Sequence, residues 1–109
     1  MPDAMAVQVT IYLNESDKWQ NKPLHMAILN YLHAENVFAA CTLHAVGGFL
    51  GRQRVKTSRL VDAGGKLPVI IIFVDVDENV SRVLPKLKEM APSHLIVREN
   101  VVLEQGNLD

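Results

Sequence analysis

The sequence predicts an α+β fold in which a four-stranded antiparallel sheet carries two helices on one face. Three observations lead to this prediction. Residues 6–13 alternate apolar and polar side chains, which is typical of a half-buried strand. Residues 24–32 repeat apolar side chains at spacings of three and four, as an amphipathic helix does. Residues 69–74 form a β-branched apolar run that is too short for a helix.

The first half of the chain gives a strand, a helix and a second strand. After the strand 6–13, residues 14–21 are polar and turn-like. The helix is expected to begin near Pro23, because the first helical position needs no backbone N–H. Asn36 is expected to end the helix, and residues 39–46 form the second strand. That strand runs directly into Gly47 and Gly48.

The second half begins with a long irregular region, residues 47–66, which holds five of the six glycines and in which residues 55–61 are compatible with an extended arm. A strand at 67–76 then leads into a helix for which Asp77 is the expected N-cap. Pro85 should kink that helix, and Pro92 should end it. The last strand is expected over 95–104, followed by a loose tail over 105–109.

This order of elements is the split βαβ, ferredoxin-like sandwich, and 109 residues suit one domain covering residues 1–109. An apolar content of 49% is enough for a core, in which the lone Cys41 is expected as a buried packing thiol. The longest apolar stretch, residues 67–74, is far shorter than the roughly 20 residues of a membrane-spanning helix. The first residues also lack the pattern of a secretory signal, so a cytoplasmic protein is expected.

The net charge predicts that nucleic acid is not a partner. Eleven basic and twelve acidic residues leave a charge of −1, whereas domains that bind the double helix usually carry a strong basic excess.

The apolar run at residues 69–74 predicts assembly of several copies. A strand with one face in water should alternate apolar and polar residues, and this strand does not. A second copy of the chain would cover the open face of the sheet, although a tail or loop of the same chain is an alternative cover.

A basic segment free of acidic residues predicts an anion site. Arg52, Arg54 and Lys56 follow Gly47 and Gly48, and no acidic residue occurs from 36 to 61. Glycines let backbone N–H groups approach a phosphate, and arginine offers paired donors that match its oxygens. The alternative is a solvated hairpin arm whose charges favour solubility.

A second candidate binding segment lies between the first strand and the first helix. Loops at such positions often bind ligands, and a helix N-terminus favours anions. Glu15, Lys18 and Trp19 are its candidate residues, with Trp19 able to stack on a base. The alternative is that Trp19 covers the flank of the helix.

The chemistry of a metal site or an enzyme is not indicated. Four histidines are scattered and no pair of His or Cys residues has the spacing of metal ligands. Asp75, Asp77 and Glu78 are explained by helix capping and by the helix dipole. No cofactor, metal or catalytic residue is therefore expected.

Several short segments, in order along the chain, resemble the domain of unknown function 190 family of PII-like proteins. The segments are residues 11–19 (IYLNESDKW), 22–24 (KPL), 40–42 (ACT), 47–49 (GGF), 67–70 (LPVI) and 74–75 (VD). The resemblance implies a ferredoxin-like subunit in a homotrimer packed sheet to sheet. It also implies ligand clefts between subunits, a long signalling loop at 47–66, and a cleft near 15–19 and Gly47–Gly48.

The expected function is a PII-like regulatory protein that is not an enzyme. It would bind a small anionic effector, with an adenine nucleotide among the candidates, and act through the loop 47–66 on a partner such as a membrane transporter or channel. One alternative is a metal-tolerance protein similar to CutA. Another is a small enzyme of the acylphosphatase type, although Glu15 and Asp17 stand where that activity needs an arginine-containing cradle.

Overall fold

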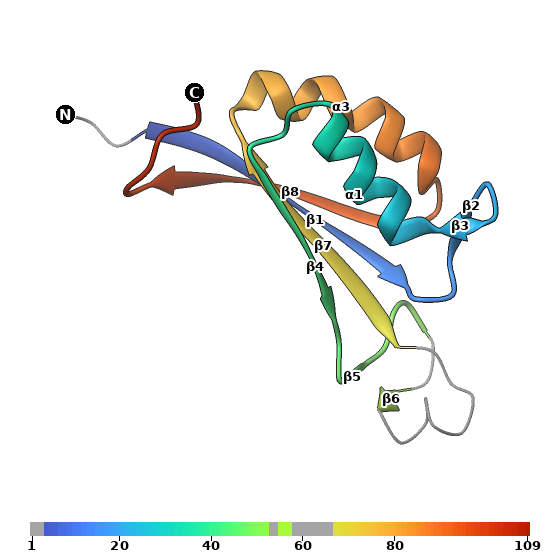
Figure 1. The fold of residues 1–109 in the computed structure, drawn as a ribbon. Helices are drawn as coiled ribbons and strands as arrows, with labels where there is room; N and C mark the ends of the chain where they lie inside the picture. The colour runs from blue at the N-terminus through green and yellow to red at the C-terminus, as the bar shows by residue number, and fades with distance from the viewer. Residues whose placement is uncertain (1–3, 53–54, 58–66) are drawn as a thin grey trace.

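The computed structural model describes residues 4–52, 55–57 and 67–109 and confirms the predicted fold class. Its four long strands are β1 (Ala4–Asn14), β4 (Ala39–His44), β7 (Pro68–Asp75) and β8 (Leu95–Leu103). They form an antiparallel sheet in the order β4-β7-β1-β8. The helices α1 (Leu24–Ala34) and α3 (Asp77–Met90) lie together on one face of this sheet (Figure 1).

The core lies between the helices and the sheet because each element buries one apolar face there. Alternate residues of β1 and β7 are fully buried, as are residues of both helices at spacings of three and four. The core residues from these elements are Val7, Val9, Ile11, Leu13, Leu24, Ile28, Leu32, Val69, Ile71, Phe73, Val80, Val83, Leu87 and Met90.

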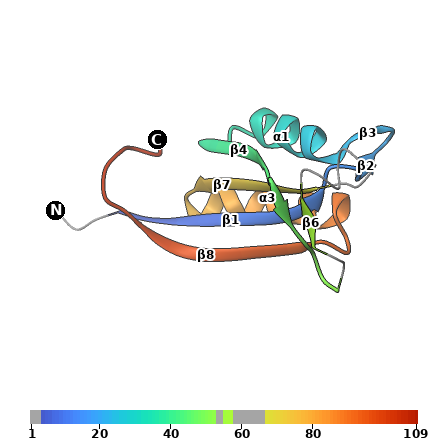
Figure 2. The same ribbon diagram turned by 90° about the horizontal axis from the view of Figure 1, so that it is seen from below.

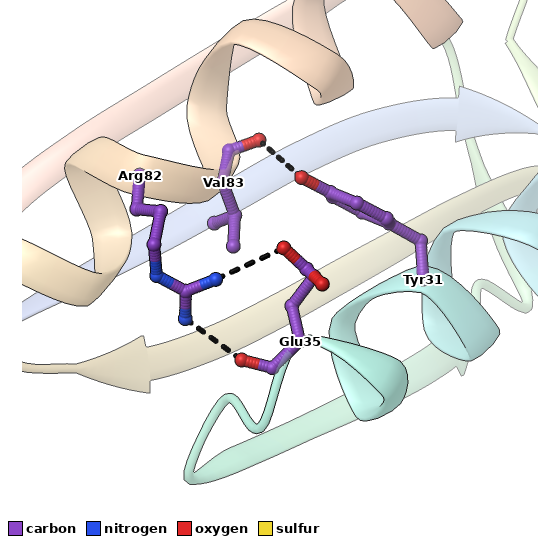
Figure 3. A network of polar contacts seen from close by, with 4 residues as sticks. All are labelled: Tyr31, Glu35, Arg82 and Val83. Carbon is purple, nitrogen blue, oxygen red and sulfur yellow. Dashed lines mark hydrogen bonds and ion pairs between the residues drawn. The ribbon is translucent and has the colours of Figure 1, made fainter.

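Polar contacts at one end of the helix layer join α1 to α3 (Figure 3). The guanidinium of Arg82 donates to the carboxylate of Glu35 at 2.9 Å and to the Glu35 carbonyl at 2.7 Å. Because Glu35 follows the last residue of α1, Arg82 satisfies a carbonyl that the helix leaves unpaired. The Tyr31 hydroxyl donates to the Val83 carbonyl at 3.4 Å, and burial raises the pKa of that hydroxyl.

A buried carboxylate joins the start of β4 to the end of β7. Asp75 is 1% exposed and accepts hydrogen bonds from the backbone N–H groups of Phe38 and Val76 and from the side chain of Asn79. These three donors occupy both carboxylate oxygens, so burial leaves neither oxygen unpaired.

The second face of the sheet is largely apolar and carries no helix; we call it the open face. In β7, Ile70, Ile72 and Val74 are half-buried and alternate with fully buried residues. Their neighbours across the strands extend the apolar surface: Leu43 and Tyr12 flank Ile70, and Cys41 and Thr10 flank Ile72. Within one chain the apolar run of β7 is therefore buried on one face only.

Four local expectations differ from the structure. Residues 14–21 contain part of a short hairpin, β2 (Lys18–Trp19) paired with β3 (Lys22–Pro23). The N-cap of α3 is Val76, and Asp77 is already helical. Pro85 lies inside α3 without interrupting it, since Pro85 and Ser81 are exposed and the Ser81 carbonyl can bond to water.

The fourth difference is Cys41, which is exposed and not a buried packing thiol. Cys41 lies opposite Ile72 on the open face of β4, at the edge of the sheet, so nothing else in the described chain covers it.

The long region after β4 is partly described. β5 (Gly47–Gly48) pairs with β6 (Lys56–Thr57), which confirms part of the predicted arm, while residues 58–61 of that arm lie outside the described residues. No helix in the described part of the chain is long and apolar enough to cross a membrane.

Candidate functional site

A cavity of about 480 Å³ lies at one end of the sheet, where the long region after β4 begins. Four segments that are distant in the sequence meet around it: the end of β1, the turn that follows it, the loop after β5, and the connection from α3 to β8. The lining residues are Tyr12, Asn14, Asp17, Leu50, Gly51, Ser93, His94 and Leu95.

Asp17 organises the polar wall of the cavity. Its carboxylate accepts a hydrogen bond from the Asn14 N–H at 2.8 Å, and its own N–H donates to the Asn14 carbonyl at 3.0 Å. The same carboxylate oxygen lies 2.8 Å from Nε2 of His94. The His94 N–H also donates to the Ala91 carbonyl. These contacts hold the α3–β8 connection against the turn after β1.

Two polar atoms in this wall have no hydrogen-bond partner among the described residues. They are Oδ1 of Asn14 and Nδ1 of His94, and both are buried. Buried polar atoms are normally paired, so an unpaired amide oxygen and ring nitrogen beside one cavity mark a place where polar partners are missing. Because neither atom is exposed, a ligand has to displace neighbouring atoms to reach them.

The apolar part of the cavity lining belongs to the open face. Tyr12 and Leu95 are directly opposite each other in the pairing of β1 with β8. Tyr12 also pairs with Ile70, which places this row on the apolar side that carries no helix. Leu95 is 60% exposed in the single chain. Any molecule that covers the open face would consequently border the cavity.

The glycines predicted at the site lie in the strand next to the cavity. Gly47 and Gly48 form β5, and a Cβ at Gly48 would lie 3.5 Å from the side chain of Pro68. Gly51, which lines the cavity, has a φ of 61°, a left-handed conformation that suits glycine.

The predicted basic residues are placed to different degrees. Arg52 is exposed and directly follows the cavity residue Gly51. The backbone of Lys56 pairs with Gly48 in the β5–β6 ladder. Arg54 lies outside the described residues. Of these three residues, Arg52 is the one that directly follows a lining residue of the cavity in the chain.

The residues predicted after the first strand are divided by the fold. Glu15 forms two hydrogen bonds with Leu67: its N–H donates to the Leu67 carbonyl, and its carboxylate accepts from the Leu67 N–H. Lys18 is exposed in β2. Trp19 packs partly buried against the core, with Nζ of Lys86 5.4 Å from its ring centre. Neither Lys18 nor Trp19 lines the cavity.

The prediction from sequence missed Asp17 and His94 as a pair. They are 77 residues apart, so no local motif relates them. The topology contains the signal, because β8 runs antiparallel to β1 and its start must therefore lie beside the end of β1. Residues just after the first strand and just before the last strand are neighbours in any fold of this type.

Comparisons with known proteins agree with this architecture. The model of the DUF190 family, described as "Uncharacterized ACR", matches residues 6–103. A UPF0166 protein of Methanocaldococcus jannaschii is 33% identical over 87 residues, which are 80% of each chain. A UPF0166 protein of Aquifex aeolicus is 22% identical over 78 residues, 72% of this chain and 74% of the relative.

A solved structure with a similar fold is CPII from Thiomonas intermedia K12, bound to ADP and bicarbonate. Its TM-score is 0.68 at 12% sequence identity, and the match covers 94% of this chain and 91% of CPII.

Proposed function

This chain belongs to the DUF190 family and has the fold of PII proteins, and we propose that it is a PII-like regulatory protein. In this proposal, a small anionic effector binds in the cavity at the start of the long loop 47–66. The loop then acts on a partner protein, for which a membrane transporter or channel is a candidate. The protein is cytoplasmic and performs no catalytic step of its own.

The observation that carries the proposal is the position and composition of the cavity. Its volume of about 480 Å³ is in the range of small-molecule sites, which run to roughly 300–1,000 Å³. Its wall combines unpaired polar atoms of Asn14 and His94 with apolar surface from Tyr12 and Leu95. That combination suits a molecule with one polar part and one flat, less polar part, such as an adenine nucleotide.

The charges near the cavity support an anion when Arg52 is included. The carboxylate of Asp17 is already engaged by the Asn14 N–H and by His94, so these groups offset part of its charge. Arg52 is exposed next to Gly51 and can supply the paired donors that phosphate oxygens require. CPII, which has the same fold, was solved with ADP and bicarbonate, both of which are small anions.

The open face supports assembly into a homotrimer in which the cavity lies between subunits. Leu43, Leu95 and Val97 are large apolar residues of this face that stay 41–60% exposed in one chain. Met5 and Val102 pair on the other face, where the ends of β1 and β8 extend beyond the helix layer (Figure 2), so the helices do not cover them. Burying the open face against sister subunits would also place a neighbour beside Tyr12 and Leu95.

Regulation requires that the effector favour one state of the loop over another. Leu50 and Gly51 form part of the cavity wall and belong to the loop itself. A bound effector would contact them directly, so its binding free energy would depend on how the loop begins.

The test is calorimetric titration of the untagged protein with ATP, ADP, AMP, cyclic AMP and bicarbonate. At least one of them should bind, and Arg52→Ala combined with His94→Ala should weaken that binding by about tenfold or more, since the charged donors of Arg52 and the polar ring of His94 are both lost. Lys88→Ala, an exposed change on α3 outside the cavity, is the matched control. Absence of binding across the panel, or equal binding by the double variant, would overturn the proposal. Chromatography of the nucleotide after incubation should show that it is not hydrolysed.

A further inference from the structure

Two histidines that the cavity does not use meet between α1 and the end of β4. The ring centres of His25 and His44 are 5.3 Å apart, and their planes are 86° to each other. His44 lies opposite Val69, a fully buried residue, so it is on the side of the sheet that faces the helices. His25 is half-buried and His44 is exposed. The pair therefore sits at the border of the helix layer and is open to solvent on one side.

The separation of the rings matches that of two imidazoles bound to one metal ion. A tetrahedral zinc ion with nitrogen ligands at about 2.0–2.1 Å places two imidazole centres about 5 Å apart. The perpendicular arrangement requires only a rotation of one ring, and the ring torsion of histidine has broad, shallow minima. Because α1 and β4 are regular elements packed on the same core, the backbone positions of the two histidines are fixed before any ion binds.

Two side chains at this junction hold polar atoms without partners in the described part of the chain. Nδ1 of His25 is buried and has no hydrogen-bond partner among the described residues. The hydroxyl of Thr42, on the same face of β4 as His44, is likewise buried and unpaired there. Polar atoms at this junction thus lack partners that an ion and its bound water would provide.

We propose that His25 and His44 form a binding site for a divalent transition-metal ion of the zinc type. The described residues contain no group of three or more His, Cys, Asp or Glu side chains arranged around one ion, so water would fill the remaining positions. An ion at this place would join α1 to the last residue of β4, three residues before the loop 47–66 begins. This inference does not depend on the effector proposed for the cavity.

The test is calorimetric titration of the untagged protein with Zn²⁺ in the absence of nucleotide. His25→Ala and His44→Ala should each weaken binding by at least about tenfold, as expected when a ligand or its support is removed. His33→Ala is the matched control, because His33 is an exposed histidine on the same helix. Cys41→Ser is a second control, because its exposed thiol lies on the opposite face of the sheet and is a group of the type that binds zinc in other sites. Both controls should bind as the unmodified protein does.

Circular dichroism would verify that each variant is folded. A measurement on the unmodified protein covers the case in which a variant fails to fold: the electron paramagnetic resonance spectrum of bound Cu²⁺ should show two imidazole nitrogens. The proposal is overturned if Zn²⁺ does not bind, if His33→Ala or Cys41→Ser weakens binding as much as the changes at the pair, or if the Cu²⁺ spectrum shows fewer than two imidazoles.

Discussion

Replacement of Ile72 by glutamate should prevent assembly of the protein without unfolding it. Ile72 lies in the middle of the open face, between Cys41 of β4 and Thr10 of β1. It is not one of the residues of the core between sheet and helices. The change therefore places a charge where sister subunits would pack, while the buried layer stays intact.

The magnitude of the effect follows from the surface that assembly would bury. Leu43, Leu95 and Val97 are 49%, 60% and 41% exposed in the single chain. At about 1.5–3 kcal/mol for complete burial of such a side chain, covering these three contributes about 2–5 kcal/mol per chain. An unpaired carboxylate in a dry interface costs several kcal/mol, which is of the same size. We expect the substitution to cancel the association free energy.

The assay is analytical ultracentrifugation over a range of protein concentrations, with circular dichroism as a check of folding. The unmodified protein should sediment as a trimer and Ile72→Glu as a folded monomer. Lys88→Glu, on the exposed surface of α3, introduces a carboxylate in the helix layer and should leave the trimer intact. A monomeric unmodified protein, or a trimer of Ile72→Glu as stable as the original, would show that the open face is not the subunit interface.

Three further predictions concern stability and can be checked by chemical denaturation. Asp75→Asn should lower the free energy of unfolding by about 1–3 kcal/mol, because an amide nitrogen would face a buried N–H donor; a smaller loss would mean that the carboxylate is not needed. Arg82→Met should cost less than about 1 kcal/mol, since its pair with Glu35 is partly exposed; a larger loss would contradict a surface role. Because the pKa of His25 is lowered in the folded protein, the unfolded chain takes up its proton first as the pH falls below 6.5, so stability should fall there. The stability of His25→Gln should depend less on pH, and an unchanged dependence would exclude this histidine as the cause.

The fold could be predicted because each long element carries its own pattern. The alternation of apolar and polar residues in β1 and the spacing of apolar residues in α1 indicate which face of each element is buried, and neither pattern depends on distant residues. The ends of the helices and strands were predicted less well from the residues near them. Val76 and not Asp77 precedes α3, and a two-strand hairpin occupies part of a stretch that reads as a polar turn. Such details depend on pairing and packing that composition does not record.

The candidate site could be predicted only in part, because its residues come from segments far apart in the chain. The glycine-rich start of the long loop lies at the end of the sheet where the structure has a cavity, and Gly51 lines that cavity. Trp19 looked like a stacking platform because it stands in a polar stretch. In the fold its ring packs on the core beside Lys86, since the β2–β3 hairpin turns it toward the helices. The pairing of Asp17 with His94 needs the strand order, which no single segment contains.

Hydrogen bonds that anchor the long loop to the sheet lie between the two proposed sites. The Ala45 N–H donates to the Pro68 carbonyl at 3.0 Å, and Glu15 holds Leu67 through two hydrogen bonds. These hydrogen bonds fix the residues on either side of the loop to the sheet. A ligand that moved those residues would have to break the bonds. The cavity residues Leu50 and Gly51 belong to the loop segment that follows the anchored Ala45. An effector bound there could favour one loop conformation without breaking the anchoring hydrogen bonds. The histidine pair lies just outside them, where an ion would stiffen the anchor and leave the loop itself free to respond.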